Sequence, residues 1–424
     1  MKRFFSLLMT LILTCSLFAC GKKQEEESIP AEAVSTSQPM AEAIAPDASA
    51  EGEVSVFAPG QEAVWTALGE RYTTLSGISV RIADRADSAA LLCVDYNTLL
   101  SLQSRISALE ESAAYSLLTT PAYTYRTEGG AVVGLPLSLE AVAVAVNTEL
   151  LEKAGYSMER LDGFKALRRF STSVNDRKEE LGFSAWAPMA LAEGSGEKLT
   201  RYLFDLPIYA ELQESGSFTG KYVGDYANYH YRDLFTTMLD LGTKTRDEVN
   251  RVTNEEALTA FAKGETLFCL VESRELDTLS ALGMDIAKLN FVPAWMGMPN
   301  EAEWGFVSDA TAYAAVAAGD PQQQHNAEDF LYWCLSDDAA QTLLSEGYDG
   351  LPYEGFSCRN ALLQVNAEND RNGLSPVLWL HRQVADPEGW DSYFLSQLHM
   401  ITPDNVVWRW QVMTWKLVDI WNGK

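Results

Sequence analysis

The stretch that decides the fold is EVSVFAPGQEAVWTALGERYTTLSGISVRI, residues 53–82. Val54–Phe57 is a short apolar run that predicts a strand, and the Ala-Pro-Gly after it predicts a turn. Apolar residues then recur at helical spacing over residues 64–75, until Gly77 supplies a stop. Residues 78–82 alternate as a second strand. A strand, a helix and a strand in succession predict a parallel sheet.

A third strand is predicted at Leu91–Val94, and three polar residues follow its carboxyl end: Asp95, Tyr96 and Asn97. Ligands of open parallel sheets bind beyond the carboxyl ends of the strands, so these side chains are candidate ligand contacts. The connection across residues 83–90 is too short for a full helix. We therefore expect a shortened crossover between the second and third strands.

A longer apolar run spans Leu139–Val146 and is interrupted only by Glu140, which predicts a deeply buried strand. Another strand at Leu267–Val271 follows a helix whose start, Asn254 and two Glu, caps and charges the N-terminus. Further helices are predicted over residues 147–155 and 336–347. This alternation of strands and helices places the chain in the α/β class.

Length and composition describe a large acidic globular protein. The chain has 424 residues, about three times a typical domain length, so two lobes or domains are expected. Hydrophobic residues make up 47% and charged residues 21%, which excludes a largely disordered chain. The net charge of -27 repels phosphate backbones, so no nucleic-acid partner is predicted.

The N-terminus carries the features of a secretory signal. Lys2 and Arg3 precede an apolar run over residues 4–19, which is shorter than the roughly 20 residues that a spanning helix needs. Leu17-Phe18-Ala19-Cys20 resembles a bacterial lipobox, although Phe18 replaces the usual small residue. Cys20 is therefore the predicted lipidation site, carrying acyl chains such as palmitate. A soluble protein cleaved nearby is the alternative.

Residues 20–52 are rich in Ala, Ser, Pro and Glu and have no apolar period. Such a segment buries too little surface to order itself, which predicts a disordered tether. With residues 1–19 as the signal peptide, the protein is expected to be lipid-anchored on the extracytoplasmic face of the cell membrane.

Cysteine usage gives no support for a metal or redox centre. Apart from Cys20 and one cysteine in the signal, four are widely scattered in apolar surroundings: Cys93, Cys269, Cys334 and Cys358. No C-x-x-C occurs, so buried free thiols are predicted, with a Cys334–Cys358 disulfide as the alternative. Residues 368–379 match only half of a calcium loop, because Trp379 stands where a Glu closes it. No metal and no cofactor is predicted.

Four phrases of the sequence occur in an order that resembles a known family. They are VSVFAP with its helix at 54–77, GLPLS leading to VN and KAG at 134–155, EALTAFAKGETLF at 256–268, and NAEDFL leading to GLP at 326–352. This order resembles the family 1 extracellular solute-binding proteins, which capture substrates for ATP-driven sugar importers. The resemblance covers about residues 51 to 355.

The resemblance implies two α/β lobes of the periplasmic-binding-protein type, with a cleft that closes on the ligand. The implied crossings lie near Ser138, Trp304 and Leu335. The implied first lobe comprises residues 53–138 plus 305–335, and the second comprises residues 139–304 plus 336–424. The expected partners are a small solute, most plausibly a sugar or oligosaccharide, and the membrane subunits of an ABC permease, and the chain is expected to be a monomer.

Several site residues follow from the resemblance by position. Gln61 and Glu62 open the first helix toward the cleft, and Glu140 falls at the hinge. Glu140 is interpreted either as an acceptor for ligand hydroxyls or as one half of an internal pair, because an unpaired buried charge is costly. Arg274 stands where the family often has an aromatic residue, and it either contacts ligand or pairs with a neighbouring carboxylate.

Tryptophans are the candidate stacking platforms, since sugars present apolar faces to aromatic rings. Trp186 matches a platform region of the second lobe, with core packing as its alternative. Trp295 and Trp304 flank the second crossing and are further candidates. Four more tryptophans near the C-terminus occur at roughly helical spacing and are predicted to lie in the core: Trp408, Trp410, Trp415 and Trp421.

Other classes of protein remain alternatives. Neither G-x-S-x-G nor H-E-x-x-H occurs, and the four histidines show no ligand spacing, so no enzyme is predicted. A secreted glycoside hydrolase is the less favoured alternative, because the separation of paired carboxylates is a spatial property. A surface lipoprotein that acts as sensor or scaffold with an altered cleft is the other.

Overall fold

The computed structural model describes residues 52–215, 225–335, 337–356, 358–384, 386–402 and 404–421. The predicted signal, the lipidation site at Cys20 and nearly all of the predicted tether lie outside the described residues. Among the helices of the described part, none has both the length and the apolar character needed to cross a membrane.

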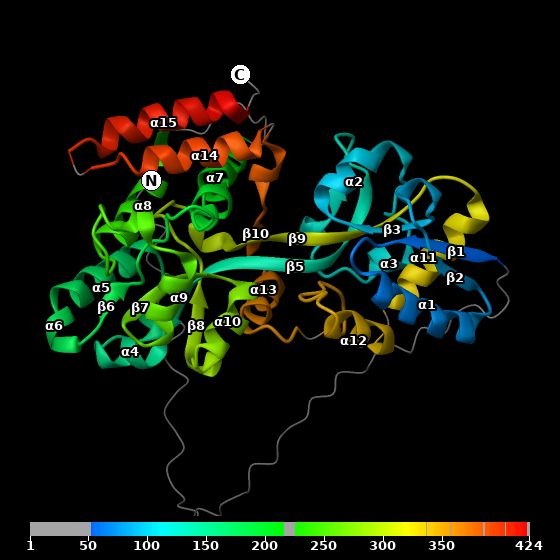
Figure 1. Cartoon of the computed structure of the whole chain (residues 1–424), viewed down its shortest axis with the longest axis horizontal. Helices are drawn as coiled ribbons and strands as arrows, with labels where there is room; N and C mark the ends of the chain where they lie inside the picture. The colour runs from blue at the N-terminus through cyan, green and yellow to red at the C-terminus, as the bar shows by residue number, and fades with distance from the viewer. Residues whose placement is uncertain are drawn as a thin grey trace, which may run out of the picture. The chain divides into compact units, whose positions relative to one another are not determined.

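The predicted N-terminal unit is confirmed (Figure 1). Strand β1 (Glu53–Phe57) leads into helix α1 (Glu62–Ser76) and strand β2 (Ser79–Ile82), and β1 pairs in parallel with β2. Strand β3 (Leu91–Val94) lies on the other side of β1, also in parallel. The short crossover before β3 contains only a 3-10 turn at Ala86–Ser88, as the connection length predicts.

Two long strands, β5 (Val132–Asn147) and β9 (Trp304–Val316), form the middle of the sheet and run side by side in Figure 1. They pair antiparallel, within the order β2-β1-β3-β9-β5-β7-β6. Strand β5 is buried at every position, which confirms the predicted buried run and extends it at its start. Strands β7 (Thr266–Glu272) and β6 (Ser184–Trp186) continue the sheet beyond β5. Three short strands pair with the two long strands: β4 (Tyr125–Arg126) and β8 (Leu289–Val292) with β5, and β10 (Ser375–Val377) with β9.

The two lobes of the fold have separate hydrophobic cores, and β5 and β9 contribute to both. The first core takes the N-terminal half of β5 and the C-terminal half of β9, and the second core takes the other halves. A third buried cluster covers the opposite face of the strands beneath α13 (Ala361–Arg371). The two strands therefore connect the lobes, with β5 buried throughout and β9 buried except at Thr311 and Ala312.

The first core is closed by helices from both ends of its sequence: α3 (Ala113–Ser116), α11 (Pro321–Cys334) and α12 (Asp337–Ser345). Helix α2 (Tyr96–Leu102) packs on the third cluster. Trp65 on α1 packs edge-on against Phe330, and its Nε1 donates to the Tyr348 hydroxyl at 2.9 Å. Because Leu343 of α12 is fully buried in this core, α12 packs on the first lobe. The expected boundary at Leu335 is therefore too early, and the chain leaves the first core after α12.

The second core is surrounded by α4 (Thr148–Lys153), α5 (Phe164–Asp176), α6 (Lys178–Leu181), α7 (Asp205–Ser215), α8 (Asp225–Asp240), α14 (Pro387–Leu398) and α15 (Val406–Trp421). Helices α9 (Asn254–Ala262) and α10 (Leu276–Ala281) pack on the third cluster. The predicted helix at 254 is confirmed, but its N-cap is Thr253, which forms a capping box with Glu256.

The prediction that all four C-terminal tryptophans lie in the core is wrong for two of them. Trp410 is fully buried, whereas Trp408 and Trp415 are 53% and 57% exposed. Residues two positions apart on a helix point about 200° apart, so Trp408 and Trp410 must lie on opposite sides of α15. Helical spacing alone did not separate the two faces.

Cysteine chemistry agrees with the prediction of free thiols. Cys93, Cys269 and Cys334 are buried and Cys358 is half-buried, and all four are free. Burial raises the pKa of the Cys269 thiol to about 12, which keeps it protonated and unreactive at neutral pH. The alternative Cys334–Cys358 disulfide is not formed.

Truncation of the two kinds of tryptophan on α15 should separate core from surface. Trp410 packs on Tyr231 and Phe235, and its Nε1 donates to Asn228. Trp410→Ala is expected to lower the free energy of unfolding by about 3–5 kcal/mol. Trp415→Ala, the matched control on the same helix, should change it by no more than about 0.5 kcal/mol. Urea denaturation measures both, and equal losses would contradict the assigned faces.

Candidate functional site

Three carboxylates lie on one face of the sheet where β5 passes from the first core to the second. Glu140 on β5 pairs directly with Asp309 on β9, and Val142 pairs directly with Glu272 on β7. Directly paired residues share a face of the sheet, and so do alternate residues of one strand. Glu140, Glu272 and Asp309 therefore lie on the same face, with Glu140 and Asp309 inside their strands and Glu272 at the end of β7.

Arg274 is shared by two of these carboxylates. It belongs to the 3-10 turn η7 (Ser273–Glu275), and its Nε–H donates to Glu272. The same Nε lies 3.2 Å from Oε1 of Glu140 and forms an ion pair with it. Oε1 of Glu140 is buried and has no hydrogen-bond partner among the described residues. The site therefore retains a buried oxygen that is ion-paired with Arg274 but has no hydrogen bond among the described residues.

The local electrostatics follow from this burial. Burial is the main cause that raises the pKa of Glu140 to about 7, Arg274 opposes the rise, and Glu272 adds to it. The pKa of Glu272 is also raised, again mainly by burial. Burial is the main cause that raises the pKa of the Tyr202 phenol, and the charges of Glu272 and Glu140 add to the rise. Near neutral pH the cluster therefore carries less than its full formal negative charge.

Two hollows meet at Arg274, whose side chain is 61% exposed. Each has about 460–470 Å³ of space, within the usual range for small-molecule sites. The first hollow is lined by residues of β5, η7, α10, β9, α12 and α13: Ser138, Leu139, Glu140, Ser273, Arg274, Asp277, Thr311, Leu344, Ser345, Gly347, Asp349, Arg359, Asn360 and Leu363. It therefore takes residues from elements of both lobes.

The second hollow is lined within the second lobe: Gly194, Ser195, Glu197, Lys198, Asn254, Glu255, Leu258, Glu272, Arg274, Glu275 and Thr278. Its wall is a buried ion pair, in which Lys198 Nζ donates to both oxygens of Glu275 at 2.7 and 2.9 Å. The same Nζ donates to the backbone carbonyl of Leu270 at 3.1 Å. Because the charges of Lys198 and Glu275 are paired with each other, this wall belongs to the packed structure of the second lobe.

Tyr96 contacts Arg382, a residue that the sequence analysis did not identify. The Arg382 guanidinium lies 4.2 Å from the centre of the Tyr96 ring, donates to Asp309, and donates to the Tyr313 hydroxyl at 2.8 Å. Tyr125 packs edge-on against Tyr96 at 5.4 Å. Arg382 thus links the predicted strand-end position to the carboxylate face. Asp309 was detectable, because a lone Asp interrupts an apolar strand there as Glu140 does.

The other predicted polar residues serve local structure. Gln61, Glu62, Asp95 and Asn97 are exposed, and none of them lines either of the two hollows. Glu62 accepts a hydrogen bond from the turn before α1, which lowers the pKa of its carboxyl. Asp95 caps α2 by accepting from the backbone N–H of Thr98. These four residues lie at the starts of helices α1 and α2.

The predicted platforms are mostly packed in the second core. Trp186 is 1% exposed, lies against Phe268, and donates from Nε1 to the Ser171 hydroxyl at 2.9 Å. Trp304 is likewise buried, and Trp295 is partly buried against the same core. A stacking platform has to present a ring face to its ligand. In this structure Trp186 and Trp304 therefore have a packing role.

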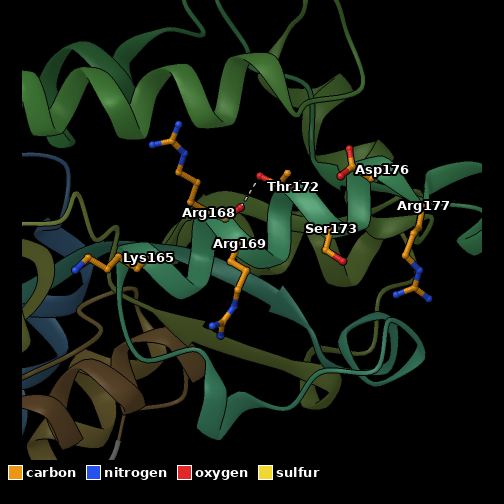
Figure 2. A pocket seen from close by; sticks show the side chains of 7 residues that line it. All are labelled: Lys165, Arg168, Arg169, Thr172, Ser173, Asp176 and Arg177. Atoms are coloured by element: carbon orange, nitrogen blue, oxygen red, sulfur yellow. Dashed lines mark hydrogen bonds between the residues drawn. The ribbon is translucent and has the colours of Figure 1, made fainter.

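A further hollow of about 640 Å³ lies along the outside of α5, far along the chain from Glu140 and Arg274. It is lined by Lys165, Arg168, Arg169, Thr172, Ser173, Asp176 and Arg177. In Figure 2 the Arg168 side chain points up, Lys165 points to the left, and Arg169 and Arg177 point down at separate places along the helix. Since they do not converge on a common point, this basic surface is not part of the candidate site.

The comparisons with known proteins agree with this geometry. The family model of the bacterial extracellular solute-binding proteins matches residues 48–353, so the chain belongs to that family. A family 1 extracellular solute-binding protein from Bifidobacterium longum subsp. infantis has a TM-score of 0.67 and 11% identity, over 88% of this chain and 100% of its own. The unliganded RafE of Streptococcus pneumoniae has a TM-score of 0.67 and 11% identity, over 88% of this chain and 98% of its own.

A third solved structure, the bacterial solute receptor AcbH, has a TM-score of 0.63 and 11% identity, over 88% of this chain and 99% of its own. At such identities the likeness shows the fold. A comparison with curated proteins gives no match. The predicted family and two-lobe α/β fold are confirmed, and the chain is an extracytoplasmic binding protein of a family that is not enzymatic.

Replacement of Glu140 should change how stability depends on pH. A carboxyl whose pKa rises from 4.5 to about 7 on folding binds its proton more tightly in the native state. The free energy of unfolding therefore falls as pH rises through that window. Glu140→Gln removes this loss. The free energy of unfolding of the variant should therefore rise relative to that of the parent by roughly 2–3 kcal/mol between pH 5 and 8.

Denaturant titrations at several pH values measure this difference. Glu152→Gln, at an exposed position on α4, is the control and should give a curve parallel to that of the parent protein. A Glu140→Gln curve that is also parallel to the parent would contradict the buried, proton-binding state of Glu140.

Proposed function

We propose that this protein captures a small carbohydrate in the hollows beside Arg274 and delivers it to an ABC permease. The observation that carries the proposal is the buried oxygen of Glu140, which has no hydrogen-bond partner among the described residues and lies beside a half-exposed guanidinium. Membership of the solute-binding family supports it.

The chemistry of the site suits a neutral polyhydroxylated ligand. A sugar hydroxyl both donates and accepts, so one ligand can donate to Glu140 and accept from the unused N–H groups of Arg274. Hydrogen bonds to charged groups contribute about 1.5–3 kcal/mol each. The solved relatives are described as binding sugars: RafE is known in complex with raffinose, and AcbH prefers β-D-galactopyranose.

Lobe closure supplies the signal to the permease. The first hollow takes Glu140 from a crossing strand and Ser345 from α12, a helix of the first lobe. A ligand that bonds to both sides favours the closed arrangement by its differential affinity for it. The permease then distinguishes loaded from empty protein by shape.

The membrane anchor completes the proposal. The lipobox-like sequence ending at Cys20 supplies a thioether-linked lipid, and residues 20–52 tether the folded body to the extracytoplasmic face of the membrane. The protein works as a monomer in this scheme.

Ligand binding is tested with the chain carrying Cys20→Ala, which lacks the lipid. Raffinose, galactose and other mono- and oligosaccharides are screened by thermal shift and then by calorimetry. A sugar at 100 times its Kd should stabilise the protein by about 2.7 kcal/mol. Glu140→Gln should weaken binding by about 1.5–3 kcal/mol, and Glu152→Gln should leave it unchanged.

Chromatography of the recovered solute separates binding from turnover. Unchanged sugar is the expected result, and cleaved sugar would transfer the protein to the hydrolases. If no carbohydrate binds at millimolar concentration, the sensor or scaffold alternative replaces this proposal.

The anchor is tested in cells. Cys20→Ala should release the protein from the membrane fraction into the medium, because the acyl chains are the proposed attachment. Mass spectrometry of the wild-type N-terminus should show the lipid mass on Cys20. Wild-type protein without that mass would contradict the anchor, whatever the outcome of the sugar screen.

A further inference from the structure

Helix α15 exposes an apolar stripe that neither the core nor the candidate site uses. Trp408, Val412 and Trp415, called the Trp stripe here, are 53%, 41% and 57% exposed. Their spacing of four and three residues places them on one face of the helix, along about 10 Å of its length. The opposite face, with Trp410 and Leu417, is fully buried in the second core.

The chemistry of the stripe fits a boundary between apolar and polar surroundings. An indole has a large apolar ring and one N–H donor, which suits a membrane interface better than either water or a protein core. Two cations flank the stripe on the same helix. The Arg409 guanidinium lies 4.9 Å from the Trp408 ring, and Lys416 is exposed next to Trp415. In a chain of net charge -27, α15 carries these two cations against Asp419 alone.

The size of the stripe argues against a second copy of the chain as its occupant. Half-exposed tryptophans and valines offer on the order of 300 Å² of apolar surface, well below the roughly 800 Å² per partner of a stable interface. A bilayer surface needs no matching area, because a few interfacial side chains partition into it individually. The stripe is therefore large enough for lipid and too small for a stable dimer.

We propose that the Trp stripe docks onto the phospholipid bilayer and holds the second lobe against the membrane surface. The inference rests on the proposed lipid anchor, since residues 20–52 as a flexible tether reach roughly 30 Å from the acyl chains. Because α15 packs on the second core, docking fixes which lobe faces the lipid. The acyl chains supply the attachment, and the stripe supplies the orientation.

The test uses the mature chain, residues 20–424, carrying Cys20→Ala, so that neither acylation nor the apolar signal masks weak docking. Its partition onto vesicles of pure phosphatidylcholine is measured by co-sedimentation at increasing lipid concentration. The double variant Trp408→Ala with Trp415→Ala should lower the partition coefficient on the order of tenfold. Trp408→Phe with Trp415→Phe should retain most of it, because apolar rings remain at both positions.

Controls separate docking from unfolding and from general hydrophobicity. Leu75→Ala with Leu282→Ala removes two other exposed apolar side chains, 55% and 40% exposed, and should leave the partition unchanged. The melting temperature of every variant should equal that of the parent, because each truncated side chain is largely exposed.

Several outcomes would overturn the proposal. The proposal is wrong if the parent and the double alanine variant partition equally, or if neither of them binds any vesicle. Binding only to phosphatidylglycerol vesicles that is lost in salt would assign the contact to the basic surface of α5 (Figure 2). Self-association that disappears in the double variant would assign the stripe to a second copy. Each of these results is independent of whether Cys20 is acylated in cells.

Discussion

The antiparallel pairing of β5 with β9 is the constraint on which the rest of the structure depends. Both strands pass through the two cores, so their register is fixed at both ends by buried apolar side chains. A shift of one residue would carry those side chains to the wrong face. This pairing places Glu140 opposite Asp309 where the strands leave one core and enter the other. Charged groups therefore stand where the two strands pass between the cores.

Part of this arrangement was predictable because it depends on neighbouring residues. The periodicity of residues 53–82 determines a local strand-helix-strand unit, and a lone Glu in an apolar run marks Glu140 as exceptional. The pairing of Asp309 with Arg382 joins residues far apart in sequence, and no local pattern indicates it. The same holds for Trp186, whose identity suited a platform while its neighbours Ser171 and Phe268 enclose it.

The tryptophans of α15 show the limit of periodicity from the other side. Their spacing indicated a helix correctly, but a helix with apolar residues on two faces does not reveal which face is buried. Trp410 faces the second core, where its Nε1–H donates a hydrogen bond to Asn228. Burial is a property of the tertiary structure, and only the packed lobe distinguished Trp410 from Trp408.

The two arginines on the carboxylate face, Arg382 and Arg274, differ in how fully their hydrogen-bonding groups are used within the protein. Arg382 is mostly buried, and its guanidinium bonds to Asp309, the Tyr313 hydroxyl and the carbonyl of Ala310. Arg274 is 61% exposed and forms an ion pair with Glu140, whose Oε1 has no hydrogen bond among the described residues. A buried carboxylate in that state has two remedies, which are to bind a proton or to accept a hydrogen bond from a ligand. Both act on the same oxygen, so solute and proton compete there. Binding at Glu140 should therefore strengthen as pH rises above about 7, where the carboxylate is ionised.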